Sequence, residues 1–428
     1  MLPVVSAFLT VHNFPVEMSI ANAVNSILYD MRLGLKDSGK KSSEAMCRTW
    51  VLPPKELPKN QSVLVMDAGG TNFRSCLVNF DAEGKVSVSD FKKTKMPGIE
   101  RELSKEEFFN QIADNIDYLK NKADRIGFCF SYVMEITKDG DGIPKAFAKE
   151  VKAKEVVGVP VGKSLVEVLE KRGWNKIKRV TLLNDTAAAL LAGAAISGSG
   201  VKYSSYIGFI LGTGMNAAYI QPKDSFVDSD FNEQIIVCES GMCDKVVHSD
   251  FDIALDKKTA LPGDHLLEKG CSGLYLGKLG FEMLNFAADN GLFSEETASK
   301  IREIKELTLI EMDSFLYNPY KPGLISDLTS DENEKQIIYE LFDVAVDRCA
   351  RNAASIISAC AIQSDAGKNP LHPISVLCNG TTFYKTHKLR ARVEKYLESY
   401  LFDEKGISYE IVSADDDITI GTAVAGLI

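Results

Sequence analysis

The sequence lacks the features of several protein classes. Its 428 residues carry 49 Lys and Arg against 59 Asp and Glu, a net charge of −10, so the basic surface typical of nucleic-acid binding is missing. No apolar run reaches the length of about 20 residues needed to span a membrane. No Lys or Arg precedes Arg32, so the start of the chain lacks the charged region of a secretory signal. We therefore expect a cytoplasmic protein with no nucleic-acid partner and no membrane span.

Cysteine pairs of the metal-binding kind are also missing. The nine cysteines are scattered, with no CxxC pair and no cluster of histidines beside them. This pattern is typical of a reducing compartment and predicts neither a disulfide framework nor a zinc site. The sequence contains no Walker A motif, which excludes P-loop kinases.

Residues 64–78 contain a phosphate-type turn between two apolar strands. The turn carries Asp67, Gly69, Gly70, Thr71 and Asn72. Adjacent glycines allow backbone N–H groups to converge on one point, which suits a phosphate. A carboxylate at the end of the first strand is well placed to hold Mg²⁺ beside that phosphate. The alternative is an ordinary β-hairpin with a Gly-Gly turn.

Residues 206–219 repeat the order of strand, glycine and threonine turn, and strand. The residues that correspond to the first turn are Gly212, Thr213, Gly214 and Asn216. A repeated unit predicts two related halves that face each other across a cleft. The glycine spacing also fits a dinucleotide-binding fingerprint, but that fingerprint must open a helix. Because 217–222 reads as a second strand, we do not favour a dehydrogenase.

One carboxylate stands between the two turns in the sequence. A strand at 180–183 ends in Asn184, Asp185 and Thr186, which open an alanine-rich helix. Asp is a favoured helix cap, so Asp185 alone would be interpreted as a cap. Its position between two phosphate turns favours a second interpretation, in which Asp185 is a general base.

Several segments follow one another in the order seen in the hexokinase family of sugar kinases, which this sequence resembles over residues 60–428. They are DAGGTNFR at 67–74, FSY at 130–132, FAKEV at 147–151, LLNDT at 182–186, GTGMNA at 212–217, ESGMCD at 239–244, PGDHLLEKGCSGLYLG at 262–277 and CNGTTFYK at 378–385. The resemblance implies an α/β protein with the actin-like (ribonuclease-H-like) duplicated fold, two lobes and a central cleft. The implied small lobe is 60–183 plus 418–428, and the implied large lobe is 1–59 plus 184–417.

The family resemblance also implies a function. A hexokinase transfers the γ-phosphoryl group of ATP, with Mg²⁺, to the 6-hydroxyl of a hexose, and glucose is the first candidate; Asp185 would be the general base. The implied sugar contacts are Ser131, Lys149, Asn184, Asn216, Glu239 and Glu268. The implied nucleotide site is Asp67, Gly69, Gly70, Thr71, Asn72, Arg74, Gly212, Thr213, Gly214, Gly380 and Thr381, with Asp67 also beside the metal. Arg74 has an alternative role as a structural ion pair.

Three departures from the family pattern leave the sugar open. They are Ala148 in place of a threonine, Tyr132-Val133 in place of an aromatic-proline pair, and Asn379 in place of an acidic residue. The alternatives are therefore a kinase of another hexose such as mannose, or a catalytically weak sugar sensor. An actin-like ATPase is a third alternative, and it would hydrolyse ATP without sugar. The sequence does not indicate the oligomeric state.

Local patterns predict individual elements. Residues 16–49 read as helical, and Ser104 with Glu107 forms a capping box. Ser164 with Glu167 predicts a second helix start of the same kind, and a final helix is expected to begin near Gly421. The alternation of strands and helices indicates α/β architecture.

Overall fold

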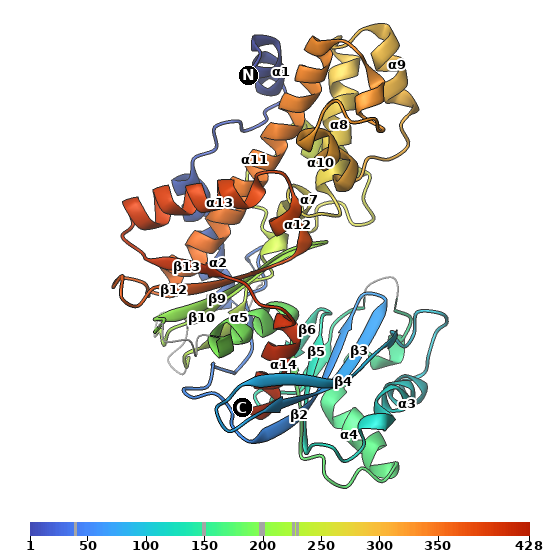
Figure 1. Cartoon of the computed structure of the whole chain (residues 1–428), viewed down its shortest axis with the longest axis vertical. Helices are drawn as coiled ribbons and strands as arrows, with labels where there is room; N and C mark the ends of the chain where they lie inside the picture. Colours follow the sequence, from blue (N-terminus) through green and yellow to red (C-terminus); the bar gives the residue numbers. More distant parts are fainter. Residues whose placement is uncertain (38–40, 148–150, 197–201, 225–226, 228–230) are drawn as a thin grey trace.

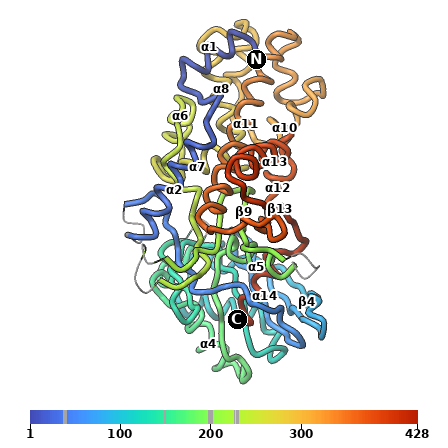
Figure 2. Tube along the Cα trace, turned by 90° about the vertical axis from the view of Figure 1, so that its left-hand side faces the viewer, coloured from blue at the N-terminus to red at the C-terminus, as the bar shows by residue number. Residues whose placement is uncertain are grey.

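Two β-sheets, one in each lobe, organise the protein (Figure 1). The computed structural model describes residues 1–37, 41–147, 151–196, 202–224, 227 and 231–428. The amino terminus lies at the far end of the large lobe and the carboxyl terminus in the small lobe (Figures 1 and 2). Among the described residues, no helix combines the length and the apolar character needed to cross a membrane.

The small-lobe sheet has the strand order β4-β3-β2-β5-β8. Its strands are β2 (Gln61–Gly69), β3 (Asn72–Phe80), β4 (Val86–Lys95), β5 (Arg125–Phe130) and β8 (Arg179–Leu183). β2, β3 and β4 form an antiparallel meander, and β5 and β8 extend the sheet in parallel with β2. A separate two-stranded sheet pairs β6 (Met134–Ile136) with β7 (Gly142–Pro144).

The large-lobe sheet repeats this topology. Its strands are β1 (Cys47–Arg48), β9 (Ser205–Leu211), β10 (Met215–Gln221), β11 (Gln234–Val237), β12 (Ile374–Asn379) and β13 (Tyr409–Val412). β9, β10 and β11 form the meander, β12 and β13 run parallel to β9, and β1 is an additional edge strand. The repeat is what a duplicated fold requires. Because the second glycine turn leads into an antiparallel strand and not into a helix, the dehydrogenase alternative is wrong.

Two helices pack side by side between the sheets, as Figure 1 shows. They are α5 (Asp185–Ile196) and α14 (Asp417–Leu427). A Cβ at Gly421 would lie 1.8 Å from the Ala188 carbonyl oxygen, so only glycine allows the two helices to approach this closely. α14 begins at Asp417, one turn earlier than the expected start near Gly421, and it also packs on β5. The sequence-derived lobe boundaries remain a prediction.

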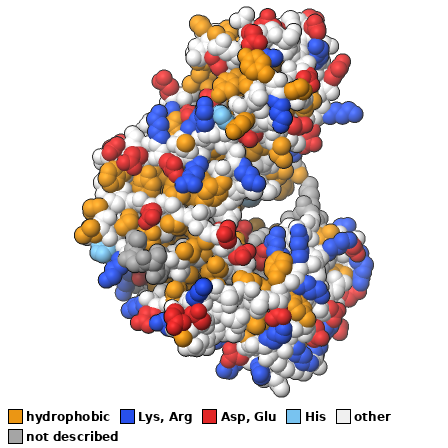
Figure 3. All heavy atoms as spheres, in the orientation of Figure 1, with side chains coloured by type: hydrophobic (Ala, Val, Ile, Leu, Met, Phe, Trp, Pro, Cys, Tyr) orange, Lys and Arg blue, Asp and Glu red, His pale blue; other side chains and the backbone are white. Residues whose placement is uncertain are grey.

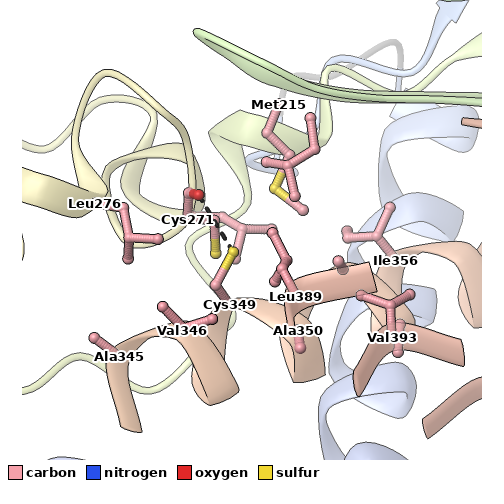
Figure 4. Close-up of a cluster of buried hydrophobic side chains, with 14 of the residues drawn as sticks. Met215, Cys271, Leu276, Ala345, Val346, Cys349, Ala350, Ile356, Leu389 and Val393 are labelled. Carbon is pink, nitrogen blue, oxygen red and sulfur yellow. Dashed lines mark hydrogen bonds between the residues drawn. The ribbon is translucent and has the colours of Figure 1, made fainter. Parts of the chain in front are cut away.

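Helices surround the large-lobe sheet and extend the lobe away from the cleft. They are α1 (Pro3–Val11), α2 (Ile20–Asp37), α6 (Asp250–Lys257), α7 (Leu266–Lys269), α8 (Leu276–Asp289), α9 (Glu295–Glu303), α10 (Leu309–Tyr317), α11 (Glu332–Gln363), α12 (Thr381–Lys385) and α13 (Leu389–Leu397), followed by a π-helical turn at Glu398–Glu404. α11 packs against α2, α8, α13 and β10. Figure 4 shows part of this core, where the Cys349 thiol donates a hydrogen bond to the Cys271 carbonyl oxygen at 3.3 Å.

The small lobe carries α3 (Lys105–Ile116) and α4 (Val161–Lys171). Short 3-10 turns in the chain are η1 (Asp117–Leu119), η2 (Lys154–Val156), η4 (Ser240–Met242) and η5 (Ser326–Leu328). The predicted capping box of Ser104 and Glu107 is confirmed at the start of α3. The predicted start at Ser164 is wrong, because α4 begins at Val161 and Ser164 is buried inside it. The Asp141 carboxylate caps α4 from a distant turn, accepting hydrogen bonds from the Gly162 N–H at 2.6 Å and the Lys163 N–H at 2.9 Å.

The expectation of a helix over 16–49 is correct only for α2. After this helix the chain turns back on itself. The Asp30 carboxylate on α2 accepts hydrogen bonds from the backbone N–H groups of Ser43 and Glu44 at 3.0 and 2.9 Å. These bonds hold a non-helical segment, 41–46, that leads into β1.

Candidate active site

The first glycine turn, between β2 and β3, is tight. Gly69 pairs with Asn72 in the sheet register, so only Gly70 and Thr71 form the turn, and Gly70 has a φ of 56°. Ser131 follows β5 and lies against this turn, since its N–H donates to the Ala68 carbonyl oxygen at 3.0 Å. A Cβ at Gly69 would lie 3.6 Å from the Ser131 Cβ. The turn and a predicted sugar contact therefore adjoin each other in the small lobe.

Asp67 and Arg74 face each other across β2 and β3. The Arg74 Nη1 lies 2.6 Å from the Asp67 Oδ2, and both side chains keep some exposure to solvent. This arrangement matches the ion-pair alternative for Arg74. A role for Arg74 toward a transferring phosphate stays a prediction.

Asn184 and not Asp185 caps helix α5. The Asn184 Oδ1 accepts a hydrogen bond from the Thr186 N–H at 2.7 Å, and the Asn184 carbonyl oxygen accepts one from the Ala188 N–H at 3.0 Å. Since the neighbouring residue fills this role, the carboxyl group of Asp185 is not needed as the helix cap.

The Asp185 carboxyl group interacts electrostatically with Asp67 of the small lobe and Glu239 of the large lobe. Burial raises the pKa of Asp185, hydrogen bonds from Thr186 and Ser131 oppose the rise, and the charge of Asp67 adds to it. A carboxyl group whose ionised form is destabilised by burial and by a like charge is typical of an acid–base site.

Glu239 approaches the same place from the large lobe. It precedes η4 with a left-handed backbone, φ 55°, which is uncommon for a residue other than glycine. Burial, followed by the charge of Asp185, raises the pKa of Glu239 to about 7, and a hydrogen bond from Asn216 opposes the rise. The Asn216 Oδ1 accepts a hydrogen bond from the Ser240 N–H at 3.3 Å, so β10 holds the Glu239 loop in place.

Glu268 lies behind the second glycine turn. Its Oε2 accepts a hydrogen bond from the Met215 N–H at 3.0 Å, and burial raises its pKa. A Cβ at Gly214 would come within 2.8 Å of this oxygen, so Gly214 leaves room for Glu268. The turn predicted to bind nucleotide therefore also supports a predicted sugar contact.

The second turn is braced by other loops. The Gly212 carbonyl oxygen accepts hydrogen bonds from the Gly273 N–H at 2.8 Å and the Thr382 Oγ1 at 2.9 Å. Gly380 has a φ of 118°, and a Cβ there would lie 2.2 Å from the Leu211 carbonyl oxygen, which excludes any other residue. Sequence reasoning missed Thr382, although it lies within the CNGTTFYK segment.

Two adjoining cavities open beside this turn. One, of about 480 Å³, is lined by Thr213, Thr381 and Thr382 among others. The second, of about 540 Å³, is lined by Gly380, Thr381 and Tyr384 among others. Between the lobes the surface is hollowed, as Figure 3 shows. Asp185 lies where the lobes meet, since Asp67 and Ser131 of the small lobe and Glu239 of the large lobe interact with it.

Known proteins match this chain along nearly its whole length. Two family models, both described as Hexokinase, match residues 11–195 and 206–428. The chain is 28% identical to Hexokinase-1 of Schizosaccharomyces pombe over 89% of its own length and 81% of that protein. It is 26% identical to Hexokinase-1 of Arabidopsis thaliana, with 95% and 87% covered.

This chain belongs to the hexokinase family. It is an ATP-dependent sugar kinase. Among solved structures, a hexokinase crystal structure aligns over 100% of both chains with a TM-score of 0.79 and 20% identity. The hexokinase of Schistosoma mansoni, solved in complex with glucose, aligns over 99% of both chains with a TM-score of 0.76 and 23% identity. The predicted actin-like, two-lobed fold is confirmed.

One departure from the hexokinase pattern has a structural explanation. The Asn379 side-chain amide lies 2.9 and 2.7 Å from the two carboxylate oxygens of Asp417. An acidic residue at position 379 would repel Asp417, whereas an amide can donate to it. The pairing joins the end of β12 to the start of α14, and nothing local in the sequence indicates that these residues meet.

The structure thus brings most of the predicted site residues of this kinase to one region. Ser131, Asn184, Asp185, Asn216, Glu239 and Glu268 come from both lobes and from the boundary between them. Gly212, Thr213, Gly214, Gly380 and Thr381 form one connected wall. Lys149 and the unusual Ala148 lie outside the described residues.

Proposed function

We propose that this kinase transfers the γ-phosphoryl group of MgATP to the 6-hydroxyl of a hexose, with glucose as the sugar and Asp185 as the general base. One observation carries the proposal: the Asp185 carboxyl group lies where Ser131 and Asp67 of the small lobe and Glu239 of the large lobe all interact with it. Because Asn184 supplies the helix cap, Asp185 is available to a substrate. A base for phosphoryl transfer must lie within reach of the attacking hydroxyl, and this position suits that role.

The raised pKa of Asp185 supports the assignment. A base is most effective when its pKa is near the working pH, because it is then both largely ionised and basic enough to accept a proton. In a loose transition state the proton leaves the hydroxyl late, so holding the hydroxyl in line with the phosphorus contributes as much as basicity. Asp185 would do both.

The nucleotide would lie against the two glycine turns. Asp67 and Asp185 are close enough for the charge of one to affect the other, and a pair of carboxylates supplies the oxygen ligands that Mg²⁺ prefers. Asp67 would hold the Mg²⁺ that accompanies ATP, and the ion neutralises phosphate charge during transfer. Thr213 and Thr381 would contact the nucleotide in the adjoining cavity.

The sugar would bridge the lobes. Each sugar hydroxyl can donate and accept a hydrogen bond, and the polar residues at the lobe boundary offer both donors and acceptors. Glu239 and Glu268, whose buried carboxyl groups have raised pKa values, would gain hydrogen bonds from sugar hydroxyls. Glucose is proposed because the fold is shared with the Schistosoma mansoni hexokinase solved in complex with glucose. A sugar bound to both lobes would favour closure and exclude water, limiting wasteful ATP hydrolysis.

The test is ADP release coupled to a spectroscopic assay, measured with MgATP and a panel of hexoses, together with direct detection of the sugar phosphate. We expect turnover only with sugar, greatest for glucose, and a 6-phosphate product. Turnover that is greater with mannose would change the proposed sugar. ATP hydrolysis without sugar would favour the ATPase alternative, and glucose binding in calorimetry without product would favour a sensor.

A further inference from the structure

A second group of ionisable side chains lies in the large lobe, outside the residues assigned to substrates. Asp30 on α2, Glu44 in the segment before β1, and Cys243 directly after η4 are all buried. One potential ligand atom from each lies within 4.8 Å of the others. The three residues come from separate parts of the chain.

Glu44 is the unusual member of this group. Its side chain is 0% exposed, yet neither carboxyl oxygen has a hydrogen-bond partner within the part of the chain that the structure describes. Asp30, by contrast, is well satisfied, since its Oδ2 accepts hydrogen bonds from the Glu44 N–H at 2.9 Å and from the backbone N–H of Ser43 at 3.0 Å. A buried carboxyl group without a partner is costly, and packing alone would be served better by an apolar residue. Glu44 therefore needs another partner.

We propose that Asp30, Glu44 and Cys243 bind a divalent cation of the zinc type. A cysteine sulfur beside carboxylate oxygens disfavours Mg²⁺ and Ca²⁺, which prefer oxygen ligands, and favours Zn²⁺. Zinc accepts cysteine sulfur at about 2.3 Å and carboxylate oxygen at about 2.0–2.2 Å. Three protein ligands leave a fourth position for water.

The charges around the group agree with a cation. A bound cation would displace the protons of the Glu44 carboxyl group and the Cys243 thiol, so that two carboxylates and a thiolate surround it. The Lys245 Nζ lies 3.6 Å from the Asp30 Oδ1, but Lys245 also pairs with the more exposed Asp244. Lys245 therefore offsets only part of the charge, and a divalent cation would offset most of the remainder.

The spacing requires at most a small movement. Ligand atoms of a tetrahedral zinc ion lie roughly 3.3–3.7 Å apart, given the usual metal–ligand distances, whereas those of the three side chains span up to 4.8 Å. Glu44 can close this gap because it has no hydrogen bond to lose. The Asp30 Oδ1 accepts one long hydrogen bond, from the Ser43 N–H at 3.2 Å, and keeps a lone pair for the metal.

A bound cation would fasten the loop that carries Glu239. Cys243 ends the η4 turn that follows Glu239, and the Asp244 N–H donates to the Ser43 Oγ at 3.0 Å. The metal would tie this loop to α2 and to the segment before β1. The sequence offers no sign of such a site because its ligands are far apart and include only one cysteine. The expectation of no zinc site is based on the lack of paired cysteines and of a histidine cluster.

The test uses the full chain without a polyhistidine tag, treated with a chelator and then titrated with Zn²⁺ against a chromophoric competitor in excess Mg²⁺. We expect one Zn²⁺ per chain. Cys243→Ser and Glu44→Gln should each weaken binding by at least about 10–100-fold, the range reported for supporting ligand shells. The matched control is Cys349→Ser, a buried cysteine of the same lobe whose hydrogen bond to Cys271 a hydroxyl can keep; its affinity should be unchanged.

Cd²⁺ provides a second readout, because a bound thiolate gives a charge-transfer absorption in the ultraviolet. We expect this absorption in wild type and Cys349→Ser and its loss in Cys243→Ser. If Cys243→Ser does not fold, the absorption in wild type and its weakening in Glu44→Gln decide the question. The absence of stoichiometric zinc in wild type, equal affinities of the two cysteine variants, or a more stable Glu44→Gln with unchanged zinc affinity would each overturn the proposal.

Discussion

The two glycine turns have similar sequences but different surroundings. In the small lobe, the carbonyl oxygens of Gly70 and Thr71 accept hydrogen bonds from the Tyr132 hydroxyl at 3.2 Å and the Met96 N–H at 3.0 Å. A Cβ at Gly70, however, would meet no described atom within 4 Å. In the large lobe, the turn between β9 and β10 is held by Gly273, Thr382 and Glu268. The two turns therefore differ in the space around their glycines: Gly70 faces open space, whereas Gly214 packs against the Glu268 carboxylate.

This difference indicates that the glycine turns of the two duplicated halves have different roles. The large-lobe network joins the nucleotide turn to Glu268, so a disturbance of the turn should reach the sugar contacts. The small-lobe turn can move with its sheet as a unit when the lobes close. The lobes share a topology, but the side chains packed against the two glycine turns differ.

The largest effect is expected at Asp185, which lies between the turns. We predict that Asp185→Asn lowers kcat by roughly 10²–10⁴-fold, the usual contribution of a general base. Its melting temperature should not fall, because Asn184 keeps the helix cap and a buried carboxyl group is removed. Kinetics and thermal unfolding of the same preparation measure both.

The matched control is Asp141→Ala, which removes a true helix cap from α4. It should lower stability by about 0.5–2 kcal/mol, the usual value of a cap, and leave kcat unchanged. A nearly wild-type kcat for Asp185→Asn would show that Asp185 has no part in the chemistry.

The contrast between the turns can be tested with alanine. Gly214→Ala would place a Cβ within 2.8 Å of the Glu268 Oε2 and displace it, so KM for the sugar should rise roughly ten-fold, which corresponds to about 1.5 kcal/mol for a hydrogen bond to a charged group. Gly70→Ala meets open space, and its cost is backbone strain of about 1–2 kcal/mol at positive φ. Its melting temperature should fall while KM for the sugar changes little. Equal effects of both substitutions on sugar KM would remove the distinction.

The bracing of the second turn predicts a smaller effect at Thr382. Thr382→Val removes the hydroxyl that donates to the Gly212 carbonyl oxygen. A neutral hydrogen bond contributes about 1 kcal/mol, so KM for MgATP should rise several-fold. Thr382→Ser keeps the donor and should resemble wild type. If serine and valine behave alike, the hydrogen bond does not support the nucleotide site.

The last prediction concerns the pH dependence of stability at Glu239. The folded pKa of Glu239 is about 7, above the value of about 4.3 expected in the unfolded chain. The folded state therefore holds a proton that the unfolded state releases, and wild type loses stability as pH rises between these two values. Glu239→Gln does not titrate, so its melting temperature relative to wild type should increase from about pH 5 to about pH 8. If the melting temperatures of wild type and Glu239→Gln change in parallel with pH in the absence of sugar, the ionised carboxyl group of Glu239 is not destabilised by burial.

Some structural features could be predicted because they depend on neighbours in the chain. The capping box of Ser104 and Glu107 is an example, since both partners lie within one helical turn. The cap of α4 could not be predicted, because Asp141 reaches it from another element. Two other features could not be predicted for the same reason, because their residues come from distant parts of the chain. They are the pairing of Asn379 with Asp417 and the group of Asp30, Glu44 and Cys243.

The sequence by itself determined the family, the duplicated topology and the residue types of the site. Glycine turns, strand periodicity and the order of motifs can be recognised in short segments of the sequence, without knowing which distant segments pack together. Only the tertiary structure decided that Asn184 takes the helix cap, that Gly214 makes room for Glu268 and that Glu44 is buried without a partner. Those outcomes depend on which distant segments pack together, because burial and like charges, not residue identity, decide what each carboxyl group can do.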